Sequence, residues 1–552
     1  MSSLLEAEQA ALAVEVSHWE ASGSEKGQIY TRPEVVEYML TAIGLDVCAN
    51  DSSVTVLEPS CGHGEFTTEI IRRLITLPVV KPTTEELVGK LFAIDLVGES
   101  VKTAKSRAHE ILLDHGYSED DSKTLTDSWF HVGDFLLADI PRKFRFVVGN
   151  PPYVRVENIP KVLLAEYRRR FTTMTDRADL YVPFYERALS LLEENGKLSF
   201  ICTDRWTKNT YGRSLRKLIH AKYSLELYVD LYGIEAFASN VMTYPAITQI
   251  SNTSSDLTVL LHKTNFSQSE ASKIAKSLSG ADSDIILRKG VVDDSKPWLL
   301  GAADEISLIR RLEKKFPSLE SAGCKVYIGA ATGANKIYVI NKASVDIESA
   351  RLLPVITASE IKSGKINWAG RYLINTYDQV GLVDLKDYPK MAAYLTSHKA
   401  KLSSRHVAVS DKSRWYKTID RVYENRCRLP KLMIPDISSD LVAVYDEGKF
   451  HPNNSIYYIC SQEWDLHALK VVMLSRLSSL FVKTYSTKIA NGYLRFQAQV
   501  LRKICLPQWS GLDSSLRDEL ILAGKTDAVS EYDRLVFMAY GLDEHEMEIV
   551  GF

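Results

Sequence analysis

The sequence lacks the long apolar segments that mark membrane and secreted proteins. Among its 552 residues there is no run of about 18 apolar residues, so we expect no membrane-spanning helix. The start of the chain, Met-Ser-Ser-Leu-Leu-Glu, does not have the basic-then-apolar pattern of a signal peptide. These two absences predict a cytoplasmic protein with no membrane partner.

Cysteine is scarce and has no regular arrangement. The seven cysteines are scattered along the chain, and none has the spacing of a metal-ligand cluster. A disulfide framework and a structural zinc site are therefore both unexpected. We predict reduced thiols and no bound metal.

The chain also lacks an overall excess of positive charge. Its formal net charge is −3, from 67 Lys and Arg against 70 Asp and Glu. For nucleic-acid binding the distribution of charge matters more than its sum. Residues 390–431 contain 11 Lys or Arg against 3 Asp or Glu, a local excess of 8. This excess suits a surface that faces phosphates, although a solvated helix face would have the same composition.

The most informative stretch is a short apolar run that ends in a stiff polar turn. Residues 146–149 favour a buried parallel strand, and Asn150-Pro151-Pro152-Tyr153 follows directly. The prolines have fixed φ angles and no N–H groups, so their carbonyls can only accept hydrogen bonds. Asn150 adds a side-chain acceptor and Tyr153 an aromatic face. The turn suits a grip on the amino group of a planar heterocycle, although an ordinary Pro-containing turn is equally compatible with these four residues.

A glycine-containing turn follows an earlier predicted strand. Residues 54–58 form that strand, which ends in Glu58, and the turn then leads into a helix expected to extend to residue 74. Gly62 and Gly64 within the turn would let the backbone approach a ligand closely, because they have no Cβ atom. Two glycines after a strand are by themselves weak support for a ligand site.

Two more predicted strands end in acidic residues. Residues 91–95 end in Asp95, and residues 129–135 contain Asp134 followed by Phe135. Any one of these acids could simply cap the next helix. Their order and β-α-β spacing before the Asn-Pro-Pro-Tyr turn favour a shared role at one edge of a sheet.

The rest of the first half continues the alternation of helices and strands. We expect a helix over residues 178–194 and strands over residues 197–202, 225–231 and 244–251. Near the start, Thr31 is expected to cap a helix that begins at Pro33. These elements predict an α/β domain with a mostly parallel sheet and crossover helices.

Together these motifs resemble the gamma-class adenine DNA methyltransferases of the TaqI type. The resemblance spans nearly the whole chain, but its specific motifs are all in the first half. It implies a Rossmann-like, seven-stranded domain that binds S-adenosylmethionine over residues 1–265, with segment 25–40 covering the cofactor. A bridging segment at 266–300 and a mixed α+β target-recognition domain at 301–552 are expected to follow.

The resemblance also implies roles for individual residues in binding the cofactor. Glu58 would bind the positively charged methionine end, Asp95 the ribose hydroxyls and Asp134 the adenine amino group. Aromatic residues would pack against the adenine ring. The expected cofactor-binding set is Tyr30, Thr31, Glu58, Gly62, Gly64, Asp95, Asp134, Phe135 and Phe184.

The implied reaction is methyl transfer to the N6 amino group of an adenine flipped out of duplex DNA. Asn150 and Pro151 would hold the amino group, and Tyr153 would stack on the base. Phe237, expected to be exposed on a loop, is a second stacking candidate or else an anchor in the loop's own core. The expected partners are double-stranded DNA and, if the enzyme is not solitary, a separate restriction endonuclease. We expect a prokaryotic monomer that serves a restriction–modification or related defence system.

Two alternatives stay open on the sequence alone. The Asn-Pro-Pro-Tyr grip also occurs in methyltransferases that act on RNA or on glutamine side chains of proteins. A non-catalytic DNA-specificity subunit is a second alternative. The complete set of predicted cofactor-binding residues argues against it. A fused nuclease is not expected, because the sequence contains no convincing Asp…Glu-x-Lys nuclease domain and only about 25 residues precede the first motif.

Overall fold

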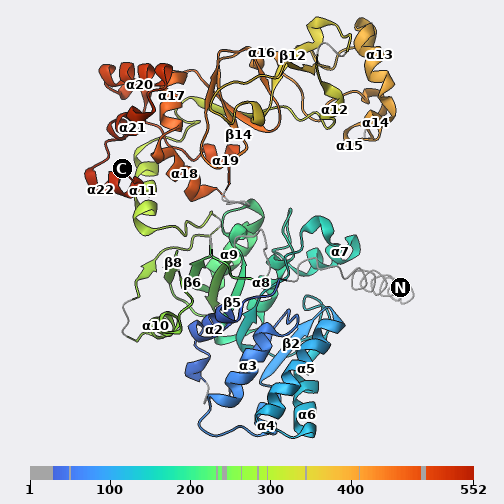
Figure 1. The fold of residues 1–552 in the computed structure, drawn as a ribbon, viewed down its shortest axis with the longest axis vertical. Helices are drawn as coiled ribbons and strands as arrows, with labels where there is room; N and C mark the ends of the chain where they lie inside the picture. The colour runs from blue at the N-terminus through green and yellow to red at the C-terminus, as the bar shows by residue number, and fades with distance from the viewer. Residues whose placement is uncertain are drawn as a thin grey trace. The chain divides into compact units, whose positions relative to one another are not determined.

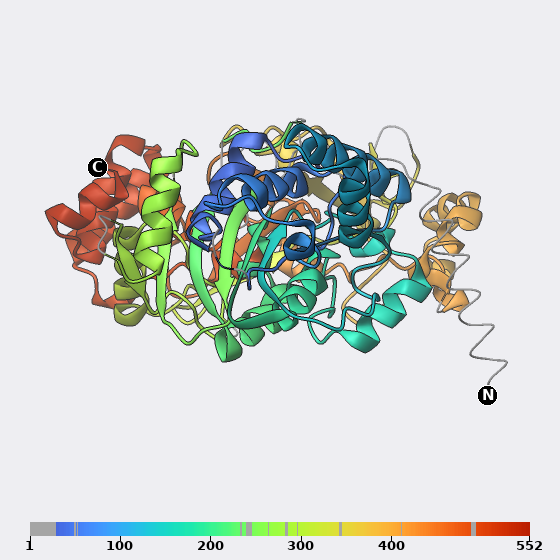
Figure 2. The same cartoon turned by 90° about the horizontal axis from the view of Figure 1, so that it is seen from below.

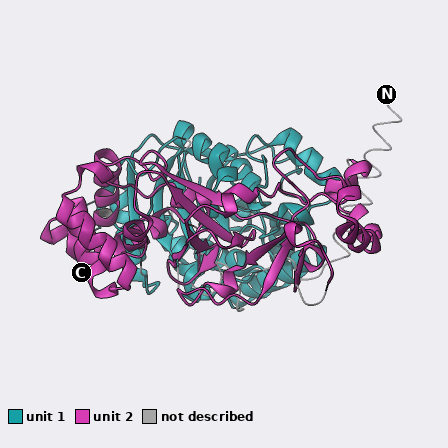
Figure 3. Cartoon of the chain, turned by 90° about the horizontal axis from the view of Figure 1, so that it is seen from above, with its two compact units in different colours: residues 1–302 teal, residues 303–552 magenta. Residues whose placement is uncertain are grey.

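The computed structural model divides into two compact units, residues 1–302 (unit 1) and 303–552 (unit 2), shown in Figure 3. Sequence-based expectations for residues 1–28, which include positions 25–28 of the cofactor-covering segment, lie outside the described residues. The structure describes residues 29–48, 51, 53–231, 234–238, 245–262, 264–281, 285–294, 296–341, 345–409, 411–486 and 493–551.

Unit 1 is built on one large sheet, whose strands alternate with helices along the chain (Figure 1). In the described part of the chain this sheet has nine strands, in the order β3-β2-β1-β4-β5-β7-β6-β8-β9. The strands are β1 (Val56–Glu58), β2 (Leu91–Asp95), β3 (Phe130–Val132), β4 (Phe144–Gly149), β5 (Leu192–Thr203), β6 (Ser224–Asp230), β7 (Pro245–Ser251), β8 (Leu257–Leu261) and β9 (Leu287–Lys289).

The first seven strands have the arrangement that the sequence predicted. The pairs β1–β2, β2–β3, β1–β4 and β4–β5 are all parallel. Strand β7 is antiparallel to both β5 and β6, so it is the one reversed strand among these seven. Strands β8 and β9 extend the sheet beyond the expected seven.

Helices cover both faces of this sheet, and each face has its own hydrophobic core. Side chains that alternate along a strand point to opposite faces. Accordingly, Val56 packs with residues of α2, α3, α5, α6 and α10, whereas Leu57 packs with residues of α7, α8 and α9. Figure 2 shows the strands between these two sets of helices. The helices of unit 1 are α2 (Pro33–Ala42), α3 (Glu65–Thr76), α4 (Thr84–Leu87), α5 (Gly98–Asp114), α6 (Glu119–Trp129), α7 (Lys161–Arg170), α8 (Tyr181–Ser190), α9 (Arg213–Lys222) and α10 (Gln268–Leu278).

Two local expectations were wrong. Thr31 does not cap α2: Arg32 occupies the N-cap position, and its side chain makes no capping hydrogen bond in the part of the chain that the structure describes. Thr31 instead forms a β-bridge with Phe237. Helix α8 ends at Ser190 rather than at residue 194, because β5 already begins at Leu192 and pairs there with Phe144.

The segment expected to be a bridge, residues 266–300, contributes two elements to unit 1. Strand β9 pairs with β8 at the edge of the sheet, and α10 packs against α2. The Tyr38 hydroxyl of α2 donates a hydrogen bond of 2.8 Å to Glu270 of α10. Where the functional domains begin and end stays a prediction.

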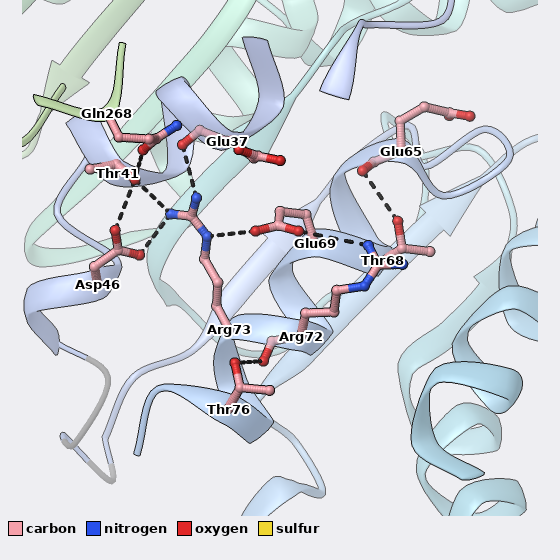
Figure 4. Close-up of polar contacts among 10 residues, drawn as sticks. All are labelled: Glu37, Thr41, Asp46, Glu65, Thr68, Glu69, Arg72, Arg73, Thr76 and Gln268. Carbon is pink, nitrogen blue, oxygen red and sulfur yellow. Dashed lines mark hydrogen bonds and ion pairs between the residues drawn. The ribbon is translucent and has the colours of Figure 1, made fainter. Parts of the chain in front are cut away.

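A buried arginine fixes α2 against α3 (Figure 4). Arg73 of α3 donates to the backbone carbonyl of Glu37 at 3.0 Å and to the carboxylate of Asp46 at 2.7 Å. It also pairs with Glu69 at 3.0 Å. The Thr41 hydroxyl lies 2.7 Å from Gln268 Oε1, which links this cluster to α10. The cluster therefore anchors the helix that directly follows residues 29–32.

Unit 2 has no β-α-β repeat within its described residues. There it contains two four-stranded sheets, in the orders β10-β18-β14-β16 and β11-β13-β12-β17, and a two-stranded pair, β15-β19. The strands are β10 (Cys324–Ile328), β11 (Val339–Asn341), β12 (Leu352–Ile356), β13 (Arg371–Ile374), β14 (Lys431–Pro435), β15 (Ile437–Ser438), β16 (Val444–Asp446), β17 (His451–Pro452), β18 (Ile456–Ser461) and β19 (Leu494–Arg495).

The helices of unit 2 lie mainly at its beginning, within its basic segment and at its end. This mixture of sheets and helices agrees with the predicted α+β class. The helices are α11 (Ala303–Lys315), α12 (Asn335–Tyr338), α13 (Pro389–Ser397), α14 (Lys399–Ser403), α15 (His406–Val409), α16 (Glu424–Cys427), α17 (Leu466–Met473), α18 (Arg476–Tyr485), α19 (Ala498–Leu501), α20 (Ser514–Thr526), α21 (Tyr532–Tyr540) and α22 (Glu544–Val550).

The basic segment 390–431 is not uniformly a surface for phosphates. Lys431 is fully buried and pairs with Asp446 at 2.7 Å. Arg405 donates to the backbone carbonyls of Thr332, Trp415 and Lys417 and so holds loops together. These two cations have structural roles, which reduces the charge that the segment can present to a ligand.

None of the described helices has the length and apolar character needed to cross a bilayer.

Candidate active site

Parallel strands bring the predicted site residues to one edge of the sheet. Because β1, β2 and β4 run in the same direction, their carboxyl ends lie at the same edge. Glu58 ends β1, Asp95 ends β2, and Asn150 directly follows β4. The Ser60 hydroxyl links two of these strand ends, since it donates to the backbone carbonyl of Asn150 at 3.0 Å.

The Asn150 side chain is held at its nitrogen, while its oxygen has no hydrogen-bond partner among the described residues. Its Nδ2 donates to the backbone carbonyl of Ile29 at 2.8 Å and lies 3.3 Å from the Thr31 hydroxyl. The carbonyl of Ile29 can only accept a hydrogen bond, which fixes the orientation of the amide. The Asn150 Oδ1 is buried and accepts no hydrogen bond within the described part of the chain. An unpaired buried acceptor of this kind is costly and indicates a site for a donor group.

Tyr153 and Phe237 pack against each other beside Asn150. Their ring centroids are 6.3 Å apart and the rings are nearly perpendicular, at 81°. Tyr153 is half-buried between the two cores of unit 1, and its hydroxyl donates to the carbonyl of Ile201 at 3.3 Å. The expectation that Phe237 is exposed was wrong, since only 6% of its surface is accessible. The bridge to Thr31 and the packing on Tyr153 account for its burial.

Glu58 is a buried carboxylate, and one of its two oxygens has no hydrogen-bond partner among the described residues. Only 1% of the residue is accessible, and its Oε2 has no hydrogen-bond partner among the described residues. Burial raises the pKa of Glu58 well above its ordinary value, and the neighbouring carboxylates of Glu65 and Asp95 raise this pKa further. A cationic ligand would offset both effects.

The turn that follows Glu58, residues 59–64 (the glycine turn), brings its backbone close to the Asp95 carboxylate. The Gly62 amide donates to Asp95 Oδ2 at 2.9 Å, and the Val97 amide donates to Oδ1 at 2.9 Å. Burial nevertheless raises the pKa of the Asp95 carboxyl group. Gly64 has a φ of +92°, and a Cβ there would lie 3.1 Å from the Cβ of Ala104 on α5. The turn therefore requires glycine at this position.

The third acidic position, Asp134, is hydrogen-bonded on both oxygens. The Leu136 amide donates to Oδ1 at 2.8 Å, and the Tyr167 hydroxyl of α7 donates to Oδ2 at 2.6 Å. Burial raises the pKa of Asp134, and the Tyr167 hydrogen bond lowers it in part. The neighbouring Phe135 packs on Phe184 of α8, with ring centroids 5.1 Å apart. A carboxylate has about four acceptor positions, so Asp134 can still accept from a ligand.

Residues 29–32 also contribute to the site and contact three other parts of it. Besides the contacts to Asn150, the Ala238 amide donates to the Tyr30 carbonyl at 2.9 Å, and the Arg32 amide donates to the Ala236 carbonyl at 3.1 Å. The Tyr30 ring packs on His63 in the glycine turn, with centroids 4.9 Å apart. The segment thus connects the Asn150 turn, the Phe237 loop and the glycine turn.

Three residues of the site were not found from the sequence. Ile29 anchors the Asn150 amide through its backbone, which leaves no trace in residue type. Ser60 holds the Asn150 backbone, and Tyr167 holds Asp134. The short polar turn 59–64 could have indicated Ser60, whereas a tyrosine in a basic helix gave no signal for Tyr167.

The residues present fit S-adenosylmethionine. This cofactor carries a positively charged methionine end, for which the unpaired Glu58 Oε2 offers a buried anionic partner. Asp95 and Asp134 provide further acceptors at the same edge of the sheet, and Phe135 with Phe184 provides an apolar wall. When bound, the cofactor would supply an electrophilic methyl group.

Two family models match this chain. Residues 65–237 match the Eco57I restriction-modification methylase family, and residues 353–506 match the TaqI-like C-terminal specificity domain. The first match begins at Glu65, the first residue of α3, and ends at Phe237, so it contains the Asn-Pro-Pro-Tyr turn.

Two curated relatives match over nearly their whole length. The type II methyltransferase M.XhoI of Xanthomonas vasicola is 42% identical over 96% of this chain and 99% of its own. The type II methyltransferase M.PaeR7I of Pseudomonas aeruginosa is 41% identical over 98% of this chain and 96% of its own.

A solved structure is similar in fold. The type IIL restriction–modification enzyme MmeI in complex with DNA matches 94% of this chain and 76% of its own, with a TM-score of 0.62 and 13% identity. Identity this low concerns the fold alone, whereas the two curated relatives establish the family. The chain belongs to the type II DNA methyltransferases of restriction–modification systems, which use S-adenosylmethionine as methyl donor.

Proposed function

We propose that this protein methylates the N6 amino group of adenine at a specific sequence in double-stranded DNA. The observation that carries the proposal is the Asn150 side chain, whose Oδ1 is a buried acceptor without a partner among the described residues. Its position is fixed because Nδ2 is hydrogen-bonded to the Ile29 carbonyl. The membership in a DNA methyltransferase family favours DNA over the RNA and protein substrates that the sequence alone left open.

The exocyclic nitrogen of adenine is a poor nucleophile, because its lone pair is delocalised into the ring. Asn150 Oδ1 and the Pro151 carbonyl would accept its two hydrogens and draw the lone pair toward the methyl group. No hydrogen bond to the Pro151 carbonyl forms within the described part of the chain, so this acceptor is also available. Neither oxygen is a strong base, so the proton leaves after methyl transfer. Catalysis on this account is mainly positioning and electrostatic stabilisation.

The target adenine has to leave the duplex to reach this turn. Flipping a base costs a few kcal/mol, and stacking on an aromatic ring returns about 1–3 kcal/mol per base. Tyr153 would provide the stacking face, and Phe237, packed edge-on against it, would hold that ring in place. Phe237 could also contact the base directly if the bridge to Thr31 opens on DNA binding.

The cofactor would be held by residues at or after the ends of β1, β2 and β3, by the glycine turn, by residues 29–32 and by Phe184 of α8. Glu58 would neutralise the methionine end, with Tyr30 and Thr31 over it. Gly62 and Gly64 would allow close approach of the backbone. Asp95 would accept from the ribose hydroxyls, and Asp134 from the adenine amino group between Phe135 and Phe184. A separate endonuclease, a monomeric state and a cytoplasmic location remain predictions.

The test is single-turnover methyl transfer by Asn150→Ala. We expect the rate to fall by about 100-fold or more, because the lost contact strengthens as the nitrogen becomes cationic in the transition state. Affinity for DNA and for S-adenosylmethionine, measured on the same samples, should change little. Asn158→Ala is the matched control, since Asn158 is an exposed asparagine after the same turn. Wild-type turnover in Asn150→Ala would contradict the proposed grip.

A further inference from the structure

A cavity in unit 2 combines charged, aromatic and neutral polar side chains. Its volume is about 290 Å³, near the lower limit of ligand pockets, which is roughly 300 Å³. It lies where β17 and β18 meet the loop that precedes α16. Its polar and aromatic lining consists of Asp420, Arg421, Tyr423, Arg426, His451 and Tyr458. All six residues lie within the part of the chain that matches the specificity-domain family.

Arg426 is the most informative of these residues. Its guanidinium carbon lies 4.1 Å from the ring centroid of Tyr423 and 4.9 Å from that of Tyr327. Tyr327 in turn stacks on Tyr458, with centroids 5.3 Å apart. The guanidinium forms no hydrogen bond or ion pair with any described residue. It is thus oriented by aromatic faces, while its N–H donors stay available to a ligand with paired acceptors.

The neighbouring groups restrict the kind of ligand. Arg421 donates to the backbone carbonyls of Asp378 and Gln379, at 3.1 and 2.8 Å. Its guanidinium therefore stabilises a neighbouring loop. Asp420 accepts from the Ala331 amide at 2.8 Å and keeps a carboxylate in the cavity wall. This carboxylate would repel a phosphate, which argues against a contact to the DNA backbone.

His451 adds a neutral acceptor. Burial lowers the pKa of its imidazole to about 4, so the ring is uncharged at neutral pH. Nδ1 lies 2.8 Å from the Pro452 carbonyl and must donate to it, which leaves Nε2 as an acceptor. A cation, an anion and a neutral acceptor in one small cavity match the major-groove edge of a base pair, which presents donors beside acceptors, better than a phosphate.

We propose that Arg426 is a specificity-determining residue that contacts a guanine of the target sequence through O6 and N7. A bidentate arginine–guanine pair is the commonest specific contact in the major groove, and it needs a guanidinium with two free, parallel N–H groups. The two tyrosine rings supply that orientation before DNA binds. This inference rests on the proposed function as a sequence-selective DNA methyltransferase.

The experiment uses the full chain and duplex DNA. Sequencing of DNA modified by the wild-type protein first defines the target motif. Methylation rates are then measured on a duplex with that motif and on all its single-base-pair variants. For Arg426→Met we expect the preference at one G·C pair to fall by about 5- to 150-fold, because methionine keeps an apolar stem against the tyrosine rings but has no N–H donors for the guanine. Preferences at the other positions should stay as in the wild type.

Arg428→Met is the matched control. Arg428 lies two residues further along, is exposed, and pairs only with Glu424 among the described residues, at 2.8 Å. We expect this variant to have the wild-type preferences. A thermal unfolding curve of Arg426→Met that coincides with that of the wild type shows that the fold is intact.

Three outcomes would overturn the inference. A uniform fall in rate on every duplex would indicate a phosphate contact, and unchanged preferences at all positions would exclude a base contact. An equal loss in Arg428→Met would assign the effect to general charge. If the wild-type protein methylates no DNA, the proposed function itself fails, and that result is distinct from the first three.

Discussion

At the scale of single residues, Glu58 is a carboxylate that the protein buries without a counterion among the described residues. Because its folded-state pKa is raised, the unfolded state loses this proton first as the pH rises. The stability that the proton contributes is present below the ordinary pKa of Glu and is lost as the pH rises through the folded-state pKa. The free protein should therefore be destabilised by Glu58 at pH 8 relative to pH 5.

Glu58→Gln separates stability from cofactor binding. We expect the variant to be more stable than the wild type at pH 8 in urea unfolding, with a smaller difference at pH 5. Its affinity for S-adenosylmethionine should fall by about 10-fold or more, since hydrogen bonds to charged groups contribute roughly 1.5–3 kcal/mol. Glu99→Gln, at an exposed glutamate of α5, should change neither property. A stability difference that shrinks with rising pH would contradict this account.

Tyr153 is expected to act through its ring and not through its hydroxyl. The hydroxyl donates one long hydrogen bond of 3.3 Å to Ile201, whose loss should cost about 1 kcal/mol or less. Tyr153→Phe should therefore keep most of the methylation rate, whereas Tyr153→Ala should lose about 10-fold or more. Phe237→Ala should reduce base flipping, measured by 2-aminopurine fluorescence at the target position. Equal losses in Tyr153→Phe and Tyr153→Ala would show that the hydroxyl matters instead.

The residues that could be predicted are those whose side-chain type carries the chemistry. Asn150, Glu58 and Asp95 end or follow apolar runs, and the parallel sheet brings those ends together. Ile29 and Tyr167 could not be predicted, because they act through a backbone carbonyl and through a contact across the fold. The exposure of Phe237 was misjudged for the same reason: its partner Thr31 lies about 200 residues away in the sequence.

At the scale of elements, the Arg73 cluster joins α2 to α3 (Figure 4). Arg73→Met should lower the free energy of unfolding by about 2–3 kcal/mol, less than for a fully buried pair because Asp46 and Glu69 are partly accessible. The variant should also bind S-adenosylmethionine more weakly, since residues 29–32 directly precede α2. Urea unfolding and calorimetric titration measure the two effects.

Arg72→Met is the control for that prediction. Arg72 adjoins Arg73 on α3, but its side chain is about half exposed and pairs with Glu69 at 3.7 Å. We expect a change in unfolding free energy of about 0.5 kcal/mol or less. Similar losses in both variants would mean that the cluster has no special role in anchoring α2.

Elements were easier to predict than their ends. Strand β2 was placed with both its ends, since the apolar run 91–94 is bounded by a lysine and ends in Asp95. The end of α8 was misplaced, because Asn195 and Gly196 are typical of a helix end but lie within β5. Asn195 has a φ of +58° there, beside the irregular pairing of β5 with β4. Local turn chemistry could not distinguish a helix end from a bulged strand.

At the scale of the whole molecule, the two units should separate by function. A shortened chain that ends at Ala302 keeps the complete sheet of unit 1 and should bind S-adenosylmethionine like the full chain. It should lose sequence-selective methylation, because the specificity-domain match lies in residues 353–506. Calorimetry and methylation of a mixed-sequence duplex test both points. Selective methylation by the shortened chain would contradict the assignment of recognition to unit 2.

A chain that ends at Asn265 provides a comparison. It lacks α10 and β9, so Tyr38 and Thr41 lose their partners Glu270 and Gln268. We expect it to unfold at a lower temperature than the chain that ends at Ala302. Equal stability of the two shortened chains would mean that residues 266–302 are only a connection.

The central claim is that the full chain transfers a methyl group to the N6 atom of adenine in DNA. The most direct test is to methylate duplex DNA with the purified protein and isotopically labelled S-adenosylmethionine, digest the product and identify the labelled nucleoside by mass spectrometry. The account predicts that the label is found in N6-methyladenine and in no other nucleoside. Label in N4-methylcytosine would keep the amino-group grip but contradict adenine as the substrate, and label in 5-methylcytosine would contradict the role of Asn150 altogether.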